Sequence, residues 1–190
     1  MKKILVSIAL IAAAAFSANA QYRVEAGIRL ACYEFNDTDL FGPVAPEVRA
    51  FANLVNFADG GIEIGLGFGQ DAITNESLKS KMNISNLELP IHLFYGFDLG
   101  HCNLAIYAGL YGSYALAGKT VTAEKLINDP FDGPTGMKRA NFGLDDELIL
   151  TIRNQLTIGI GAQSGFLNVC KDKDISVNAA AFFATIGWRF

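Results

Sequence analysis

Residues 62–69 read Ile-Glu-Ile-Gly-Leu-Gly-Phe-Gly, with an apolar side chain at every second position and Glu63 or glycine between them. Side chains of a β-strand point alternately to its two faces, so this period of two indicates a strand with one apolar face. Seven further segments alternate in the same way: 22–33, 47–55, 87–97, 103–116, 141–152, 155–165 and a last one that ends at Phe190. The pattern therefore predicts an all-β chain of eight strands.

The connections between these segments alternate in length. Short connections cover 56–60, 98–102 and 153–154, whereas longer ones cover 36–46, 70–85, 117–140 and 168–175. Short turns at one end and longer loops at the other are typical of an antiparallel up-and-down transmembrane β-barrel of the outer-membrane type. An even number of strands places both termini at the short-turn, periplasmic end.

Alternation alone does not say which face points inward, because a soluble lipocalin-like barrel has the same period with its apolar face inside. The less apolar face carries many glycines: Gly65, Gly67, Gly69, Gly109, Gly159, Gly161 and Gly165. Glycine weakens a strand and makes poor solvent-facing surface, but it suits the narrow lumen of an eight-stranded barrel. The sequence thus favours a membrane barrel whose apolar face meets lipid.

The same face carries charged residues of both signs, and buried charges need partners. We expect a polar network in the lumen, formed by Arg23, Glu25, Arg29, Glu47, Arg49, Glu63, Glu88 and His92. His92 near Glu88 is compatible with an acid–base pair, but no nucleophile is placed beside it, so a structural role is favoured. Because His101 is the only other histidine, we expect no catalytic residue, no metal site and no cofactor.

Aromatic residues provide a second sign of a membrane protein. One group falls near the predicted short turns (Tyr22, Phe57, Tyr95, Phe97, Trp188 and Phe190) and another near the predicted loops (Phe68, Tyr114, Phe142 and Phe166). Two such girdles match the two membrane–water interfaces. A soluble barrel would not show them.

The first twenty residues have the pattern of a secretory signal peptide. Lys2 and Lys3 precede an apolar stretch at 4–16, and Ala18-Asn19-Ala20 follows it. We expect cleavage after Ala20 and a single barrel domain over 21–190. Without Lys2 and Lys3 the chain has 13 basic and 19 acidic residues, which gives no reason to expect a nucleic-acid partner.

Three further positions carry expectations. Cys32, at the outer end of the first strand, and Cys170, in the last long loop, would meet where the first and eighth strands adjoin, so a disulfide is one possibility and separate thiols the other. Pro90 interrupts a predicted strand, which a β-bulge would explain. Asp146 faces lipid if alternation is strict, whereas a bulge would redirect it.

Short motifs resemble those of the PorT-like outer-membrane β-barrel proteins: Leu-Glu-Leu-Pro-Ile at 87–91, Ile-Tyr-Ala-Gly-Leu-Tyr-Gly at 106–112 and Ser-Gly-Phe-Leu-Asn at 164–168. The resemblance implies an eight-stranded barrel in the outer membrane and carries no catalytic residues. The ending Thr-Ile-Gly-Trp-Arg-Phe at 185–190 resembles the signal that the outer-membrane assembly machinery recognises. We therefore expect that machinery and outer-membrane lipid as partners.

These features together predict a non-enzymatic, integral outer-membrane barrel that is structural or contacts an unknown protein partner through its outer loops, mainly Lys119–Arg139. Three alternatives stay open: a small transporter or channel, a lipid-acting enzyme and a soluble lipocalin-like carrier.

Overall fold

The computed structural model describes residues 21–35, 38–75, 80–122, 127–134 and 136–190. The expected signal peptide, residues 1–20, lies outside the described residues. Among the residues that are described, no helix is long and apolar enough to cross a membrane. The strands are β1 (Tyr22–Phe35), β2 (Thr38–Phe41), β3 (Ala45–Phe57), β4 (Gly60–Asn75), β5 (Ser80–Asp98), β6 (Cys102–Val121), β7 (Ile127–Asn128), β8 (Ala140–Ile152), β9 (Leu156–Gly165) and β10 (Val177–Arg189).

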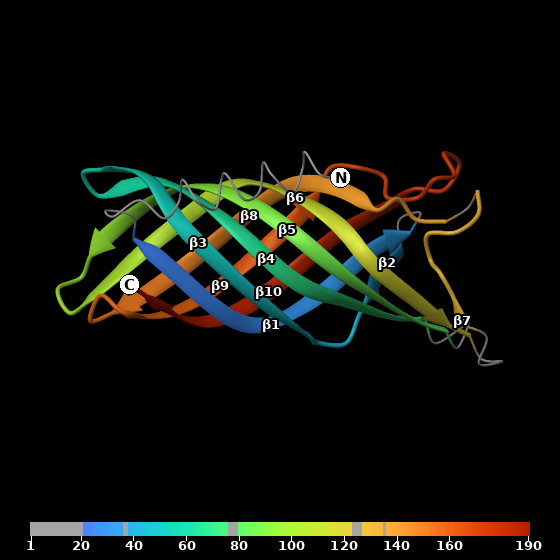
Figure 1. The fold of residues 1–190 in the computed structure, drawn as a ribbon, viewed down its shortest axis with the longest axis horizontal. Helices are drawn as coiled ribbons and strands as arrows, with labels where there is room; N and C mark the ends of the chain where they lie inside the picture. The colour runs from blue at the N-terminus through green and yellow to red at the C-terminus, as the bar shows by residue number, and fades with distance from the viewer. Residues whose placement is uncertain (1–20, 36–37, 76–79, 123–126, 135) are drawn as a thin grey trace.

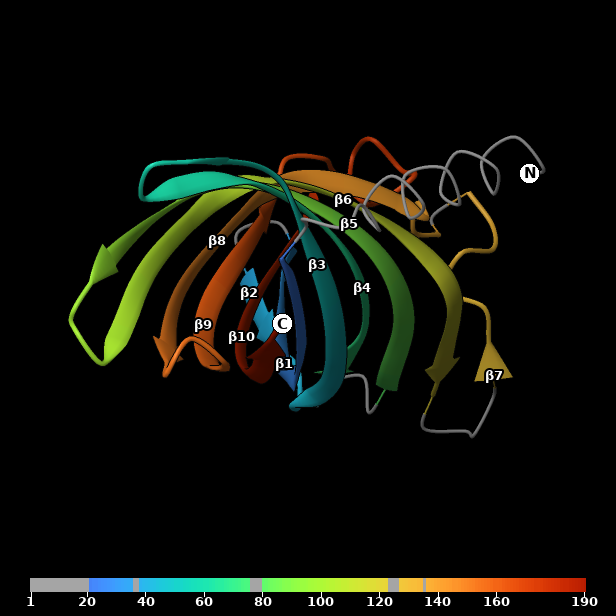
Figure 2. The same cartoon turned by 60° about the vertical axis from the view of Figure 1, so that its left-hand side comes forward.

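Eight of these strands form a closed antiparallel ring, which confirms the predicted fold class. Their order is β1-β3-β4-β5-β6-β8-β9-β10, and β10 pairs back onto β1 over the whole length from Arg23↔Arg189 to Phe35↔Val177 (Figures 1 and 2). β2 and β7 are short additions that pair with the outer ends of β1 and β6. Closure leaves none of the eight long strands at a free sheet edge, as a membrane-spanning sheet requires.

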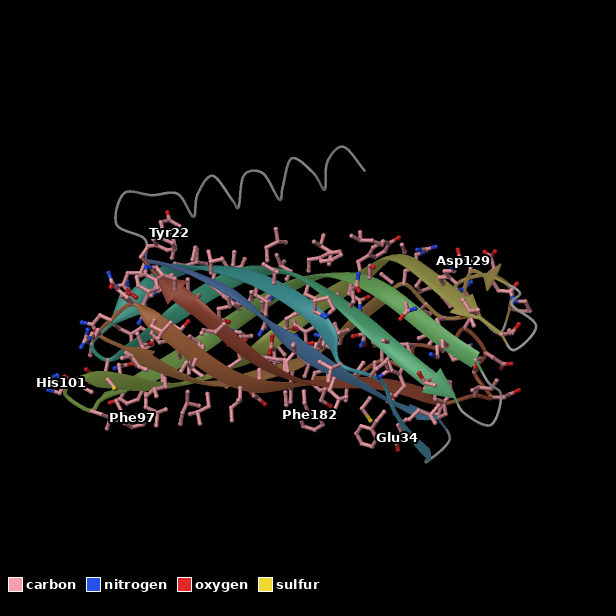
Figure 3. The ribbon with its side chains drawn as sticks, turned by 90° about the horizontal axis from the view of Figure 1, so that it is seen from below. Tyr22, Glu34, Phe97, His101, Asp129 and Phe182 are labelled. Atoms are coloured by element: carbon pink, nitrogen blue, oxygen red, sulfur yellow. The ribbon has the colours of Figure 1, made fainter. Side chains whose placement is uncertain are left out.

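The two ends of the barrel differ as predicted, although the strands reach further than expected at the loop end. Tyr22, Phe97 and His101 lie at one end, and Glu34 and Asp129 lie at the other (Figure 3). The predicted loop at 70–85 is largely a continuation of β4 and β5, which pair as far as Asn75↔Ser80. The β8–β9 turn is minimal because Arg153 and Asn154 both adopt positive φ, as a tight two-residue hairpin requires.

The bulge expected at Pro90 is absent. Pairing of β4 with β5 has the same register on both sides of the proline, at Ile64↔Ile91 and at Gly67↔Glu88, and only the pairs between them are missing. The Pro90 ring is buried, and a Cβ at Gly65 would lie 2.8 Å from its Cγ. Proline therefore fits here because the facing residue has no side chain.

Register shifts occur elsewhere, between Asn53 and Val55 in β3 and between Ser85 and Asn86 in β5. The shift in β3 places one extra residue in that strand. Leu54 and Val55, which are adjacent in the strand, are consequently both exposed.

The apolar face points outward and the charged face inward. The exterior is covered by exposed Val, Ile, Leu and Phe side chains, and the girdle aromatics Phe57, Tyr95, Phe97, Trp188 and Phe190 at one end and Phe68, Tyr114, Phe142 and Phe166 at the other are all exposed. Soluble proteins bury such side chains and rarely expose a continuous apolar surface. This arrangement excludes the lipocalin-like alternative.

Apolar clusters close the lumen at both ends. Phe94, Ala105, Tyr107 and Ile149 pack together at the periplasmic end. At the outer end, loop residues pack onto the strand ends in two clusters, one with Val169, Cys170 and Val177 and one with Phe131. A chamber of about 30 Å³ remains beneath the outer clusters, which is room for about one water molecule.

Candidate functional site

The polar interior of the barrel is the candidate site. All eight residues expected in the lumen are buried, with exposures between 0% for His92 and 5% for Arg29. They lie on β1, β3, β4 and β5, at positions that alternate with the lipid-facing ones. Three arginines organise them, one near the periplasmic end, one at mid-height and one near the outer end.

Arg23 holds the periplasmic part of the network. Its guanidinium pairs with Glu25, with Glu63 at 2.6 Å and with Glu147 at 3.3 Å. The planar group also lies over the ring of Phe51, with its central carbon 4.0 Å from the ring centroid. A flat cation with five donors suits this setting, because it satisfies several carboxylates while an aromatic ring covers its face.

Arg49 occupies the middle of the lumen and is 1% exposed. It donates hydrogen bonds to Asp145 and Glu147, which both lie on β8, across the barrel from β3. Its central carbon lies 4.5 Å from the centroid of the Phe183 ring. This residue therefore ties opposite walls of the barrel together.

Arg29 holds the outer part of the network. It pairs with Asp71 at 2.7 Å, with Glu88 at 2.9 Å and with Glu47 at 3.6 Å. Asp71 also accepts hydrogen bonds from Tyr33 and Asn86, at 3.0 and 2.7 Å. Gln163 links this level to the middle one, because its amide donates to both Glu88 and Asp145.

His92 differs from the expectation in its acidic partners, which are Glu63 and Asp145 and not Glu88. Its Nδ1 lies 3.1 Å from Glu63 and its Nε2 lies 3.4 Å from Asp145. The ring stacks on Phe51 at a centroid distance of 5.6 Å. The side chain thus joins the Arg23 and Arg49 levels and is sealed from solvent.

Several members of the network were missed by the sequence reasoning. Asp145 and Glu147 flank Asp146, and their inward direction follows once Asp146 is accepted as facing lipid. Asp71 was assigned to a loop, although it continues the alternation of Glu63, Gly65, Gly67 and Gly69. Gln163, Asn86 and the lumen tyrosines gave no distinct signal, since isolated polar residues in strands are common.

His92, Asp145 and Glu147 form the only group of potential metal ligands found among the described residues, with ligand atoms within 4.8 Å of one another. The guanidinium of Arg49 already donates to both carboxylates. A second cation there would be repelled by Arg49 and would compete for the same oxygen atoms. The donor set fits a guanidinium and not a metal ion.

The disulfide considered between Cys32 and Cys170 is not formed, and none of the three cysteines, all of them described, is in a disulfide. Cys170 packs with Ala31 and Tyr33 in the outer cluster. These residues flank Cys32 along β1, and neighbouring side chains of a strand point to opposite faces. The two thiols therefore lie on opposite sides of the barrel wall.

A closed barrel with an apolar wall and a charged, packed interior defines an integral β-barrel protein of the outer membrane. No family model and no curated protein matches the chain. Solved structures do match: Neisserial surface protein A (TM-score 0.58, 11% identity, 89% of this chain and 97% of that chain), Ail of Yersinia pestis (0.52, 10%, 90% and 99%) and OprG of Pseudomonas aeruginosa (0.50, 14%, 90% and 96%). At such low identity the likeness shows the fold, which all three outer-membrane barrels share with this chain.

Proposed function

We propose that this chain is a non-enzymatic outer-membrane barrel that acts through its outer loops, either as a structural element or by contacting a protein partner. The observation that carries the proposal is the closed lumen. Ion pairs fill it from Arg23 to Arg29, and apolar clusters cover both ends. The interior therefore supports the barrel, and the loops are left as the surface available for contacts.

Transport is the alternative that this observation disfavours. Eight strands leave a lumen that side chains just fill, and here the chamber beneath the outer clusters admits about one water molecule. Planar-bilayer recordings test this directly. We expect no discrete conductance steps from the purified, folded protein, whereas reproducible steps would favour the small-channel alternative.

A lipid-acting enzyme is disfavoured by the surroundings of His92. The ring is fully buried, and its polar contacts among the described residues are the carboxylates of Glu63 and Asp145. An acyl-transfer or hydrolytic mechanism needs a nucleophile within hydrogen-bond reach and access for substrate. The buried ring has no such access.

Two of the outer loops, the β6–β8 and β9–β10 connections, are held together by hydrogen bonds. Lys171, in the β9–β10 connection, donates to the carbonyl oxygens of Phe131 and Gly133 in the β6–β8 connection, at 2.5 and 3.3 Å. Lys138 donates to the carbonyl of Asn168 at 2.8 Å, and Arg139 lies over the Phe131 ring. An ordered loop surface supports a contact role, because less conformational freedom is lost on binding.

The similar structures point in the same direction. One is Ail, an attachment invasion locus protein whose structure is a complex with a heparin analogue, and another is Neisserial surface protein A. A small closed barrel is thus compatible with contacts made outside the membrane. From the motifs at 87–91, 106–112 and 164–168 we also propose a relationship to the PorT-like outer-membrane proteins. The signal peptide and the recognition of the C-terminal strand by the assembly machinery are further proposals.

The loop proposal is tested by replacing residues 122–136 with a short Gly-Ser turn. We expect the variant to remain heat-modifiable in gel mobility, because the closing pairs of the barrel lie elsewhere. When intact cells are cross-linked with a lysine-reactive reagent, the variant should lack the adducts that the wild-type chain forms. Failure of the barrel to assemble, or unchanged adducts, would contradict the assignment.

A further inference from the structure

A carboxylate faces lipid in the middle of the barrel wall. Asp146 lies on β8, is exposed, and pairs with Ala108 of β6 on one side and Ala162 of β9 on the other. Register is continuous along β8 through this position, so no bulge redirects the side chain. The alternation that places Asp145 and Glu147 in the lumen necessarily places Asp146 outside.

The residue lies well inside the apolar belt. Phe142 and Phe166, which pack edge to face at 5.1 Å, mark the outer girdle at this side of the barrel. Asp146 follows Phe142 by four residues, which corresponds to about 10 Å along the axis for a strand tilted by about 40° in a belt about 25 Å tall. Leu144 and Leu148 flank it on the same face, and both are exposed.

Nothing within the described part of the chain compensates this charge. The Asp146 side chain has no ion pair or hydrogen bond with any described residue. Ionisable groups at membrane depth are unfavourable without a partner and normally face a protein surface or a water-filled cavity. An unpartnered carboxylate at this depth therefore indicates a contact outside this chain.

The wall around Asp146 is hollowed. A depression of about 520 Å³ has the small residues Ala108 and Ala162 beside the carboxylate. Larger apolar side chains surround it: Ile106, Leu148, Ile160 and Phe182, of which Phe182 is labelled in Figure 3. Small residues on a lipid-facing surface let another chain approach closely, as they do between transmembrane helices.

We propose that this hollow is the docking site of a second, different membrane protein that presents a lysine or arginine to Asp146. Charge complementarity selects the occupant. Between the two aromatic girdles, the outward-facing positions of the described strands hold no Lys or Arg, so a second copy of this chain would bring no cation to this depth. Lipid ammonium groups lie at the level of the headgroups, about 10 Å away by the same strand geometry.

Site-specific photo-cross-linking in the native outer membrane tests the proposal. A photoreactive residue replaces Ile160, on the rim of the hollow, and in the control replaces Leu66 on β4, four strands away around the ring; both positions are exposed. We expect a protein adduct from position 160 and none from position 66. Asp146→Asn should reduce the adduct by about tenfold or more, the equivalent of one charge-assisted contact, while Asp146→Glu should retain it.

The partner's identity completes the test. The cross-linked segment of the partner should contain a Lys or Arg. Replacing that residue by Glu should abolish the adduct with the wild-type chain, and the same partner variant should form the adduct again with Asp146→Lys. Heat-modifiable mobility verifies that each variant is folded, and the Asn and Glu variants suffice should the Lys variant not assemble. Adducts to lipid alone, an adduct of twice the chain's own mass, or an adduct unaffected by Asp146→Asn would each overturn the proposal. Shortening the outer loops leaves this adduct unchanged, so the two proposals fail independently.

Discussion

Replacing Arg49 by methionine is the sharpest test of the lumen network. Three arginines and His92 face seven buried carboxylates, so each guanidinium serves several acids. Arg49→Met leaves Asp145 with His92 at 3.4 Å and Gln163 at 3.1 Å, and leaves Glu147 with Arg23 at 3.3 Å. Removing one partner of a buried ion pair costs about 3–5 kcal/mol. We expect a loss in the free energy of unfolding within that range.

The chain contains a single tryptophan, Trp188, on the lipid-facing side of β10, which makes the measurement direct. Urea unfolding from phospholipid vesicles, followed by its fluorescence, compares the wild type, Arg49→Met and the control Lys173→Met. Lys173 is exposed, so its replacement should change stability by less than about 0.5 kcal/mol.

A third variant separates charge from packing. Combining Arg49→Met with Asp145→Asn and Glu147→Gln removes the uncompensated charges and should recover most of the lost stability. An Arg49→Met protein within about 1 kcal/mol of the wild type would refute the reasoning, since the two carboxylates would then need no guanidinium. A triple variant no more stable than the single one would attribute the loss to packing instead.

Three further outcomes follow from the same structure. Gly65→Val should lower the unfolding free energy by about 1–3 kcal/mol, because its Cβ would meet the rings of Phe51 and Pro90, whereas Gly112→Ala, with nothing within 4 Å, should be nearly neutral in the same urea titration. Trp188 fluorescence should be quenched more by lipids with a nitroxide near the headgroup than by lipids with one at mid-chain; stronger mid-chain quenching would contradict its place in the periplasmic girdle. His92→Phe should unfold at lower urea than the wild type, because Glu63 and Asp145 each lose a polar neighbour, and an unchanged midpoint would show that the histidine is dispensable.

The sequence was sufficient for the architecture, because a closed barrel repeats one simple signal eight times. Alternation at 62–69 and in seven similar segments identified the strands, and glycine and charge on the less apolar face determined which side points inward. Local irregularities were not predictable. The shift between Asn53 and Val55 depends on how β3 meets β4, and the continuous register at Pro90 depends on the room that Gly65 leaves.

The lumen network was only half visible in the sequence. Members on regular strands, such as Arg23 and Glu63, followed from the period of two. Asp71, Asp145 and Glu147 were missed because one lies where a loop was expected and two lie in the strand with the weakest pattern. Pairings across the barrel, such as Arg49 with Asp145, depend on the register and shear of all the strands and are not encoded in any local segment.

The pairing of β10 with β1 makes the chain a ring with one opening. The amide of Phe190 donates to the carbonyl of Tyr22 at 2.8 Å, so the two ends of the described domain meet at the periplasmic rim. Circular permutation should therefore be tolerated: the ends would be joined by a turn like that of Arg153–Asn154, and new termini opened in an outer loop. The same closure delays folding, because one edge of β1 stays unpaired until β10 arrives, 142 residues later at Phe35↔Val177 and 166 residues later at Arg23↔Arg189. Joining such distant segments costs chain entropy, and this cost is offset only when the last strand pairs.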